Sequence, residues 1–301
     1  MLKKSFLTIF TTVIIFSLFF CRCNINAKEK EKHYLKFKNT EELQEFFRYK
    51  GNTDKTILVS GHRGGIERNY PENSIEVMED VLSYMPAFFE IDPRLTKDSV
   101  IVLMHDATLD RTTSGKGKLS DYTYAELASI RLKDINGNIT PYKIPTLEEV
   151  IVWSKGKTII NLDKKDVPFR MLVELIKKHK AENHVMLTVH TGAQARYYYD
   201  RLPEIMLSAF SRDLKEYEDM VISGVPWQNM IAYVGPAINE KNKEIVSLLH
   251  SHGVKCMVSF APTHDKLKDA QERKKEYEKE LLTKPDIIES DLPVEVWATI
   301  K

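Results

Sequence analysis

The chain has 301 residues, and its 44 basic and 43 acidic residues nearly cancel to a formal net charge of +1 at pH 7. This balance provides no basic excess for a nucleic-acid partner, so that class of function is excluded. The length suits one large domain or two small ones, and no segment has the composition of a linker between domains.

The N-terminus has the pattern of a signal peptide. Lys3 and Lys4 precede an apolar run over residues 6–20, which is shorter than the roughly 20 apolar residues of a membrane-spanning helix. We expect residues 1–27 to be removed after Ala27, and the mature chain to be exported to a periplasm or secreted. Residues 28–55 then form an N-terminal extension before the barrel domain.

The cysteines leave a second processing route open. Cys21 or Cys23 follows the apolar run closely enough to be the acylated residue of a lipoprotein, although the bulky Phe20 favours simple cleavage. Membrane contact is expected only if one of these two cysteines bears a lipid. Cleavage after Ala27 leaves Cys256 alone, which excludes an intramolecular disulfide framework and suggests a buried strand thiol.

Short β-branched runs alternate with longer amphipathic segments along the rest of the chain. The predicted strands are residues 56–61, 87–92, 158–163, 185–189, 205–209, 230–234, 254–259 and 286–289. The predicted helices are residues 71–84, 146–154, 167–180, 192–201, 213–222, 240–251 and 264–282. Pro71 in a first helical turn, Thr146 three residues before Glu149, and Gly253 after a helix end support these boundaries.

This alternation predicts an α/β fold, a closed (β/α)8 barrel of the TIM type over residues 56–301. An open, doubly wound sheet would give a similar pattern, so periodicity alone does not establish closure. One additional extended segment covers residues 100–105. Residues 106–145 are polar and rich in turns, and we interpret them as a small insertion after the second strand.

Three predicted strands end in ionisable residues, and the C-terminal ends of parallel barrel strands meet at the rim where barrel enzymes build their active sites. Glu90 and Asp92 lie two residues apart and so share one face of a strand. Together with Asp163 they would form an all-oxygen cluster. We therefore predict a site for a divalent metal, Mg²⁺ or Ca²⁺.

Histidines and cations near these strand ends suggest acid-base chemistry on an anion. His62 and His105 each follow a short apolar segment, and two histidines across a cleft suit general acid and general base roles. Arg63 and Lys165 are candidates for binding phosphate oxygens. The other histidines are interpreted as structural, and His190 is the weakest of these assignments because it ends a predicted strand.

The first half of the chain also contains a series of motifs in a specific order: Gly61-His62-Arg63-Gly64, Pro71-Glu72-Asn73-Ser74, Glu90-Ile91-Asp92, Thr96-Lys97-Asp98, His105-Asp106 and Leu109-Asp110-Arg111-Thr112-Thr113. In order and spacing this series resembles the signature of the glycerophosphodiester phosphodiesterase family. Later segments resemble further blocks of that family: Ile144-Pro145-Thr146-Leu147-Glu148-Glu149, Asn161-Leu162-Asp163-Lys164-Lys165 and Ile288-Glu289-Ser290-Asp291-Leu292-Pro293.

The resemblance implies metal-dependent hydrolysis of glycerophosphodiesters, which are small-molecule substrates, to sn-glycerol 3-phosphate and an alcohol. It assigns the residues to three roles: Glu90, Asp92 and Asp163 as metal ligands, His62 and His105 as the acid-base pair, and Arg63 and Lys165 as phosphate ligands. Asp163 departs from the family, which usually has a glutamate there.

Two alternatives remain open at this point. The barrel could act on a lysophospholipid or an inositol phospholipid, which a long apolar lip near the insertion would favour. It could also bind phosphodiesters without cleaving them, and only the shortened Asp163 side chain leaves room for that interpretation. Which histidine is the acid, and whether water or a substrate hydroxyl attacks, are likewise open.

Overall fold

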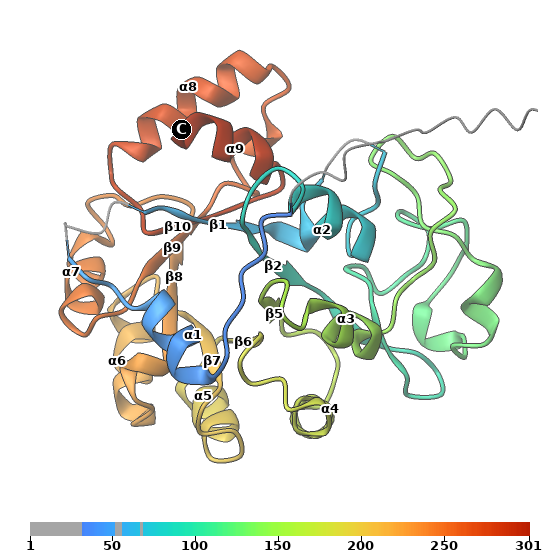
Figure 1. Ribbon diagram of the computed structural model, residues 1–301, viewed down its shortest axis with the longest axis horizontal. Helices are drawn as coiled ribbons and strands as arrows, with labels where there is room; N and C mark the ends of the chain where they lie inside the picture. Colours follow the sequence, from blue (N-terminus) through green and yellow to red (C-terminus); the bar gives the residue numbers. More distant parts are fainter. Residues whose placement is uncertain (1–31, 52–55, 67–68) are drawn as a thin grey trace, which may run out of the picture. The chain divides into compact units, whose positions relative to one another are not determined.

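The computed structural model describes residues 32–51, 56–66 and 69–301, and Lys32–Lys301 form one compact unit. Parallel strands close into a barrel in the order β1, β10, β9, β8, β7, β6, β5, β2 (Figure 1). The barrel strands are β1 Leu58–Gly61, β2 Phe88–Ile91, β5 Ile160–Leu162, β6 Val185–Val189, β7 Met206–Phe210, β8 Met230–Gly235, β9 Cys256–Ser259 and β10 Ile287–Ser290. Closure confirms the predicted (β/α)8 barrel over an open sheet.

Each barrel strand is followed by a helix, after an excursion in the case of β2. These helices are α2 Ile75–Val81, α3 Leu147–Ser154, α4 Phe169–His179, α5 Gly192–Tyr199, α6 Leu214–Ser223, α7 Lys243–Ser251, α8 Ala270–Leu281 and α9 Pro293–Ile300. The predicted Thr146–Glu149 capping box at α3 is present in both directions. Cys256 opens β9 with its side chain fully buried, as predicted.

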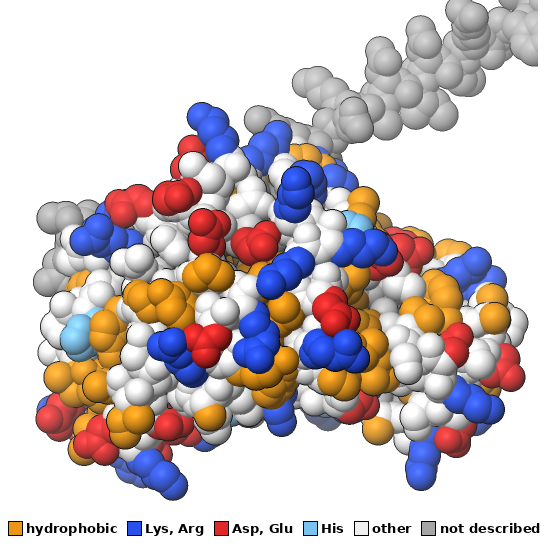
Figure 2. Space-filling model, turned by 90° about the horizontal axis from the view of Figure 1, so that it is seen from below, with side chains coloured by type: hydrophobic (Ala, Val, Ile, Leu, Met, Phe, Trp, Pro, Cys, Tyr) orange, Lys and Arg blue, Asp and Glu red, His pale blue; other side chains and the backbone are white. Residues whose placement is uncertain are grey.

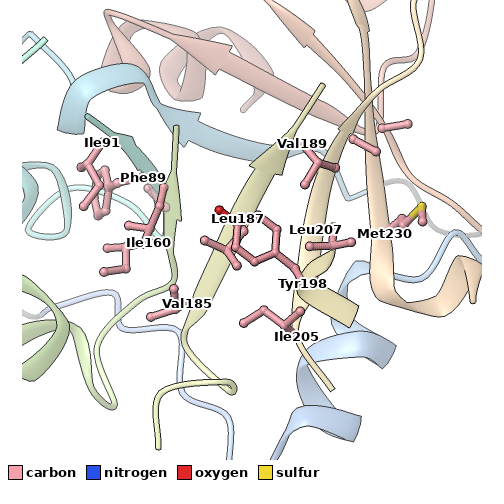
Figure 3. Packing of buried hydrophobic residues seen from close by; sticks show 14 of the residues in the cluster. Phe89, Ile91, Ile160, Val185, Leu187, Val189, Tyr198, Ile205, Leu207 and Met230 are labelled. Atoms are coloured by element: carbon pink, nitrogen blue, oxygen red, sulfur yellow. The ribbon is translucent and has the colours of Figure 1, made fainter. Parts of the chain in front are cut away.

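Side chains along each strand alternate between the helices outside and the barrel interior. In β2, Phe89 and Ile91 belong to the core between barrel and helices, whereas Phe88 belongs to a second core cluster and Glu90 lines a pocket. Figure 3 shows the outward-facing set, with Tyr198 of α5 among the strand side chains. This outer layer holds the strands in register, at about 1.5–3 kcal/mol for each large apolar side chain removed from water.

The lower end of the barrel interior is apolar. At the lower end, where the strands begin, an apolar cluster with helix α1 (Thr40–Phe47) contains one residue from each of six strands and Ile159 just before β5: Phe88, Ile159, Met186, Met206, Ile231, Met257 and Ile287. Leu43 and Phe47 of α1 complete this cluster, and both are almost fully buried. Helix α1 therefore seals the lower end, so part of the predicted N-terminal extension packs with the barrel.

The excursion after β2 begins earlier than residue 106. Strands β3 (Pro93–Leu95) and β4 (Ile101–Leu103) form an antiparallel pair directly after β2, which accounts for the extended segment at residues 100–105. The chain then winds through short 3-10 turns before α3, to one side of the barrel (Figure 1, green). A small apolar core of its own stabilises the excursion: Val102, Met104, Leu109, Leu119, Leu127, Ile130, Leu132 and Ile144.

Two predicted helices were partly wrong. Helix α2 starts at Ile75 because the Ser74 side chain caps it and Asn73 adopts a left-handed φ of 56°, so residues 71–74 are not helical. The predicted helix over residues 264–282 is a 3-10 turn, His264–Lys266, followed by α8, because the Asp269 side chain caps a new helix at Ala270.

The predicted signal peptide, with Cys21 and Cys23, lies outside the described residues. Within the described ranges, no helix combines the length and apolar character needed to cross a bilayer. Basic and acidic side chains are interspersed on the face shown in Figure 2, in keeping with the near-neutral charge of the sequence.

Candidate active site

The loop after β1 is held in an unusual conformation by its neighbours. Arg63 has a left-handed φ of 55°, and its backbone N–H donates to Glu90 Oε2 at 2.9 Å. Gly64 follows with a φ of 85°, and a Cβ built there would stand 2.7 Å from a Val77 methyl carbon. Only glycine allows the loop to pack this closely on α2, so His62 and Arg63 are fixed at the barrel mouth.

Three carboxylates meet beside this loop, and we call Glu90, Asp92 and Asp163 the mouth carboxylates. Each offers an oxygen within 4.8 Å of the others, and Glu90 and Asp92 are buried. Burial, together with the charge of Asp92, raises the pKa of Glu90 well above its usual range. Like charges in a poorly solvated place are unfavourable without a cation, and the all-oxygen donor set fits Mg²⁺ or Ca²⁺.

Lys165 partly balances this charge. Its Nζ lies 2.5 Å from Asp163 Oδ2 and 2.9 Å from Asp92 Oδ1. Burial works against ionisation of Asp163, but nearby His190 and Lys165 lower its pKa to about 2. The shorter Asp163 side chain thus still reaches the mouth carboxylates and is negatively charged at neutral pH.

Asn73 fixes Asp92 from the opposite side. The Asn73 amide donates to Asp92 Oδ2 at 2.7 Å, and the Asp92 N–H donates back to Asn73 Oδ1 at 2.9 Å. This reciprocal pair explains the left-handed backbone at Asn73, which turns the side chain toward β2 rather than into the first turn of α2. Sequence reasoning missed this partner, although the Pro71–Ser74 motif contains it.

His62 is oriented by a carboxylate from the far end of the chain. Its Nδ1 lies 2.7 Å from Asp291 Oδ1, and its Nε2 lies 3.9 Å from Glu90 Oε2. Burial disfavours the charged ring, but the Asp291 hydrogen bond and the charges of Glu90 and Glu289 outweigh it and raise the pKa of His62 to about 9. The ring therefore has a fixed orientation and holds a proton at neutral pH.

His105 has the same type of partner. Its Nδ1 lies 2.7 Å from Asp106 Oδ1. Within the described ranges, no hydrogen bond involves the Nε2 of His62 or of His105. In both rings, a carboxylate at Nδ1 leaves Nε2 available for proton exchange with a bound molecule.

A pocket of about 400 Å³ opens at the mouth, and His62, Arg63, Glu90 and Asp163 are on its wall. His105 and Lys165 are not among its lining residues. Lys165 contacts Asp163 of the wall, and contacts through Asp106, Arg111 and Glu72 link His105 to Arg63. The rest of the wall comes from inward-facing residues of later strands and loops that the sequence did not single out, among them Thr188, Ser208, Phe210, Arg212, Tyr233 and Glu289.

His190, which we had interpreted as structural, lies at the site. Its Nε2 is 3.9 Å from Asp163 Oδ1, and its ring centroid is 4.2 Å from that of Phe210. Its position directly after β6 was the available signal, since His62, Asp92 and Asp163 also come directly after barrel strands.

A second group with metal-binding residue types lies at the lower end of the barrel, away from the pocket. It consists of His250, Cys256 and Asp286, which we call the lower triad. Asp286 Oδ2 accepts hydrogen bonds from His250 Nε2 at 2.7 Å and from the Cys256 N–H at 2.8 Å. Tyr49 stacks on the His250 ring with 3.6 Å between centroids. The Asp286 carboxylate thus accepts its hydrogen bonds from the other two members of the triad, whereas the mouth carboxylates crowd negative charge together.

Comparison with known proteins places these features in a family. The model of the glycerophosphoryl diester phosphodiesterase family matches residues 62–258. Among curated proteins, a glycerophosphodiester phosphodiesterase of Bacillus altitudinis is 31% identical over 205 residues, which cover 64% of this chain and 81% of that protein.

Comparison with solved structures points to the same family. The crystal structure of a glycerophosphoryl diester phosphodiesterase from Parabacteroides distasonis is 50% identical, with a TM-score of 0.86 over 90% of this chain and 94% of the other. A phosphodiesterase of Oleispira antarctica, solved in complex with the product sn-glycerol-3-phosphate, is 21% identical, with a TM-score of 0.59 over 81% of this chain and 96% of the other. This second likeness shows the common fold.

Proposed function

The chain belongs to the glycerophosphoryl diester phosphodiesterase family, and from this premise we propose that it hydrolyses glycerophosphodiesters to sn-glycerol 3-phosphate and an alcohol, using a divalent metal and two histidines. As a member of this family it is an enzyme, a phosphoric diester hydrolase. The observation that carries the finer proposal is the group of three crowded carboxylates beside the carboxylate-oriented His62. A second such histidine, His105, directly follows Met104, whose N–H donates to the Asp92 carbonyl oxygen.

A phosphodiester is an anion, and its hydrolysis requires charge neutralisation, a positioned nucleophile and a proton for the leaving alcohol. Glu90, Asp92 and Asp163 would hold the metal, Mg²⁺ or Ca²⁺, which when bound supplies positive charge beside the phosphate oxygens. Arg63 lines the same pocket, and its buried Nε makes no hydrogen bond within the described ranges. Its guanidinium therefore keeps donor capacity for an anionic oxygen.

The two histidines would exchange protons with the substrate through Nε2. One takes a proton from the attacking oxygen, and the other gives a proton to the departing alcohol. Asp291 and Asp106 orient the two rings at Nδ1, and Asp291 also stabilises the charged form of His62. Lys165, held between Asp92 and Asp163, adds positive charge next to the mouth carboxylates.

The test is release of sn-glycerol 3-phosphate from glycerophosphocholine and glycerophosphoethanolamine by the full chain, with Mg²⁺, Ca²⁺ or EDTA. We expect metal-dependent release that His62→Ala abolishes. The matched control is His179→Ala, because His179 pairs with Glu148 at the surface of α4, away from the pocket. Release that persists in EDTA would overturn the role of the metal, and release by His62→Ala would overturn the role of the histidine.

One observation favours the lipid-directed alternative. Ile135 and Ile139 of the excursion are 60% and 64% exposed, and Ile135 lines a small pocket together with Glu72 and Arg111. These side chains provide an apolar lip beside Glu72 and Arg111, and Glu72 in turn contacts Arg63 of the site. Comparison of lysophosphatidylcholine with glycerophosphocholine as substrates separates the two activities, and faster cleavage of the lysolipid would favour the alternative.

We also propose that the enzyme is exported, on the basis of the apolar run at residues 6–20. The mass of the mature protein from the producing cell tests this proposal. Cleavage after Ala27 and acylation of Cys21 or Cys23 give different masses, and an intact N-terminus contradicts both.

A further inference from the structure

Arg111 lies in the excursion, outside the residues to which the proposed function gives a role, and its guanidinium stands between two carboxylates. Toward Asp106, Nε donates to Oδ2 at 2.7 Å and Nη2 donates to Oδ1 at 3.0 Å. Toward Glu72, Nη1 donates to Oε2 at 2.8 Å and Nη2 donates to Oε1 at 2.8 Å. These two bidentate pairs engage four of the five N–H donors of one guanidinium.

Each of these carboxylates also contacts a residue of the proposed machinery. Asp106 Oδ1, which accepts from Arg111, is the atom that lies 2.7 Å from His105 Nδ1. Glu72 Oε1 lies 3.4 Å from Arg63 Nη1, a much longer contact than its 2.8 Å bond from Arg111. Arg111 therefore connects His105 and Arg63 through one carboxylate each.

The distances indicate what Arg111 does on the Glu72 branch. The Glu72 side chain is only 8% exposed, so its charge needs a cation close by. With Arg111 present, Glu72 bonds mainly to Arg111 and only weakly to Arg63. Among the described residues, Arg63 is the other cation within ion-pair distance of Glu72, and an Arg63 drawn to Glu72 is less available to a phosphate.

On the Asp106 branch, Arg111 keeps the carboxylate charged and in place. Its hydrogen bonds hold the pKa of Asp106 well below the usual range, although partial burial opposes this. A fixed, charged acceptor at Nδ1 determines the orientation of the His105 ring. Loss of Arg111 would leave Asp106 free to rotate, and His105 with it.

We propose that Arg111 is a positioning residue that orients His105 through Asp106 and keeps Arg63 available to the phosphate by holding Glu72. This inference rests on the proposed function, because His105 and Arg63 matter only if the chain cleaves phosphodiesters. It differs from a purely structural role, in which Arg111 would merely attach the excursion to the barrel.

The experiment measures kcat, KM and the thermal midpoint of the full chain on glycerophosphocholine for Arg111→Gln, Arg111→Lys, and Arg111→Gln combined with Glu72→Gln. We expect Arg111→Gln to lower kcat about 100-fold and to raise KM about 10-fold, because a misplaced catalytic group costs this much. Arg111→Lys should recover little, since an ammonium cannot replace a planar fork.

The double variant separates the two branches. Removing the Glu72 charge should free Arg63 and bring KM back to within about 3-fold of the wild type, while kcat stays low because Asp106 is still unrestrained. The matched control is Arg131→Gln, in the same excursion, whose guanidinium donates to the backbone carbonyls of Ala128 and Ile130 and to no other group in the described part of the chain. It should retain wild-type kcat and KM.

The outcomes distinguish the inference from the function on which it rests. An inactive wild type with each metal refutes the proposed function. An active wild type with normal kinetics in Arg111→Lys overturns the inference. So does an activity loss in Arg111→Gln that disappears when rates are corrected for the folded fraction. A KM that the double variant fails to restore overturns the Glu72 branch.

Discussion

Ionisable groups at the two ends of the barrel differ in how far their charges are compensated by neighbouring residues. At the mouth, Glu90 and Asp92 are buried side by side, and the pKa of Glu90 is raised well above its usual range. At the lower end, the carboxylate of Asp286 accepts two hydrogen bonds within its own triad. A polar cluster whose hydrogen bonds are all made internally stabilises the fold, whereas a cluster with uncompensated negative charge can bind a cation.

Histidines show the same contrast. Carboxylates raise the pKa of His62 at the mouth to about 9, even though its burial acts in the other direction. His184, just before β6 at the lower end, is 4% exposed and contacts an amide and a backbone carbonyl, and burial lowers its pKa to about 4. Positive charge is thus stabilised on His62 at the mouth and disfavoured on His184 at the lower end.

The largest expected effect comes from Glu90→Gln, which removes charge from the mouth without changing side-chain shape. We expect kcat/KM for glycerophosphocholine to fall about 1000-fold, because the site loses a carboxylate on which charge balance depends. The thermal midpoint should stay the same or rise, since a buried repulsive charge is gone. Retention of more than a tenth of the activity would contradict a functional role for Glu90.

A smaller effect is expected from acidification, through His184. Its folded pKa of about 4 lies below its ordinary value of 6.5, so the unfolded chain binds the proton more readily between these values. Stability from this group is complete above about pH 6.5 and is lost progressively as the pH falls from there to the folded pKa of about 4. Between pH 7.5 and 4.5, the free energy of unfolding should fall by about 2.5 kcal/mol more in the wild type than in His184→Gln. Urea titrations at both pH values measure this, and equal decreases would refute it.

The smallest effect is expected from Asp286→Asn in the lower triad, which makes the same chemical change as Glu90→Gln. The amide oxygen still accepts a hydrogen bond, so the free energy of unfolding should fall by about 1 kcal/mol. Activity of the folded enzyme should remain that of the wild type. A loss of activity comparable to that of Glu90→Gln would remove the distinction between the two ends.

Much of this fold follows from local sequence. All eight barrel strands were predicted within a few residues, because each is a short apolar run with a helical segment after it. Helices α1 and α9 were missed although their signals were present. Asn39 caps α1 with Leu43 and Phe47 on one face, and Pro293 starts α9 ahead of Val296.

The site was predictable where function follows a strand end, and less so where it depends on contacts across the barrel. Glu90, Asp92 and Asp163 were grouped correctly, because they end neighbouring strands β2 and β5. The Asp291 partner of His62 lies 229 residues away and is brought close only by pairing of β1 with β10. The left-handed turn at Asn73 suits an asparagine, but its direction toward Asp92 depends on hydrogen bonds to a residue 19 positions away.

Helix α1 has a kinetic consequence. Leu43 and Phe47 cover the apolar cluster at the lower end, whereas the described pocket with His62 and Arg63 opens at the mouth, so substrate and products share that opening. Both fragments of a cleaved diester must depart by the route along which the next substrate arrives. Because binding and release share this opening, the turnover rate depends on how fast the more tightly bound product dissociates. Accumulated product also competes with substrate for the pocket.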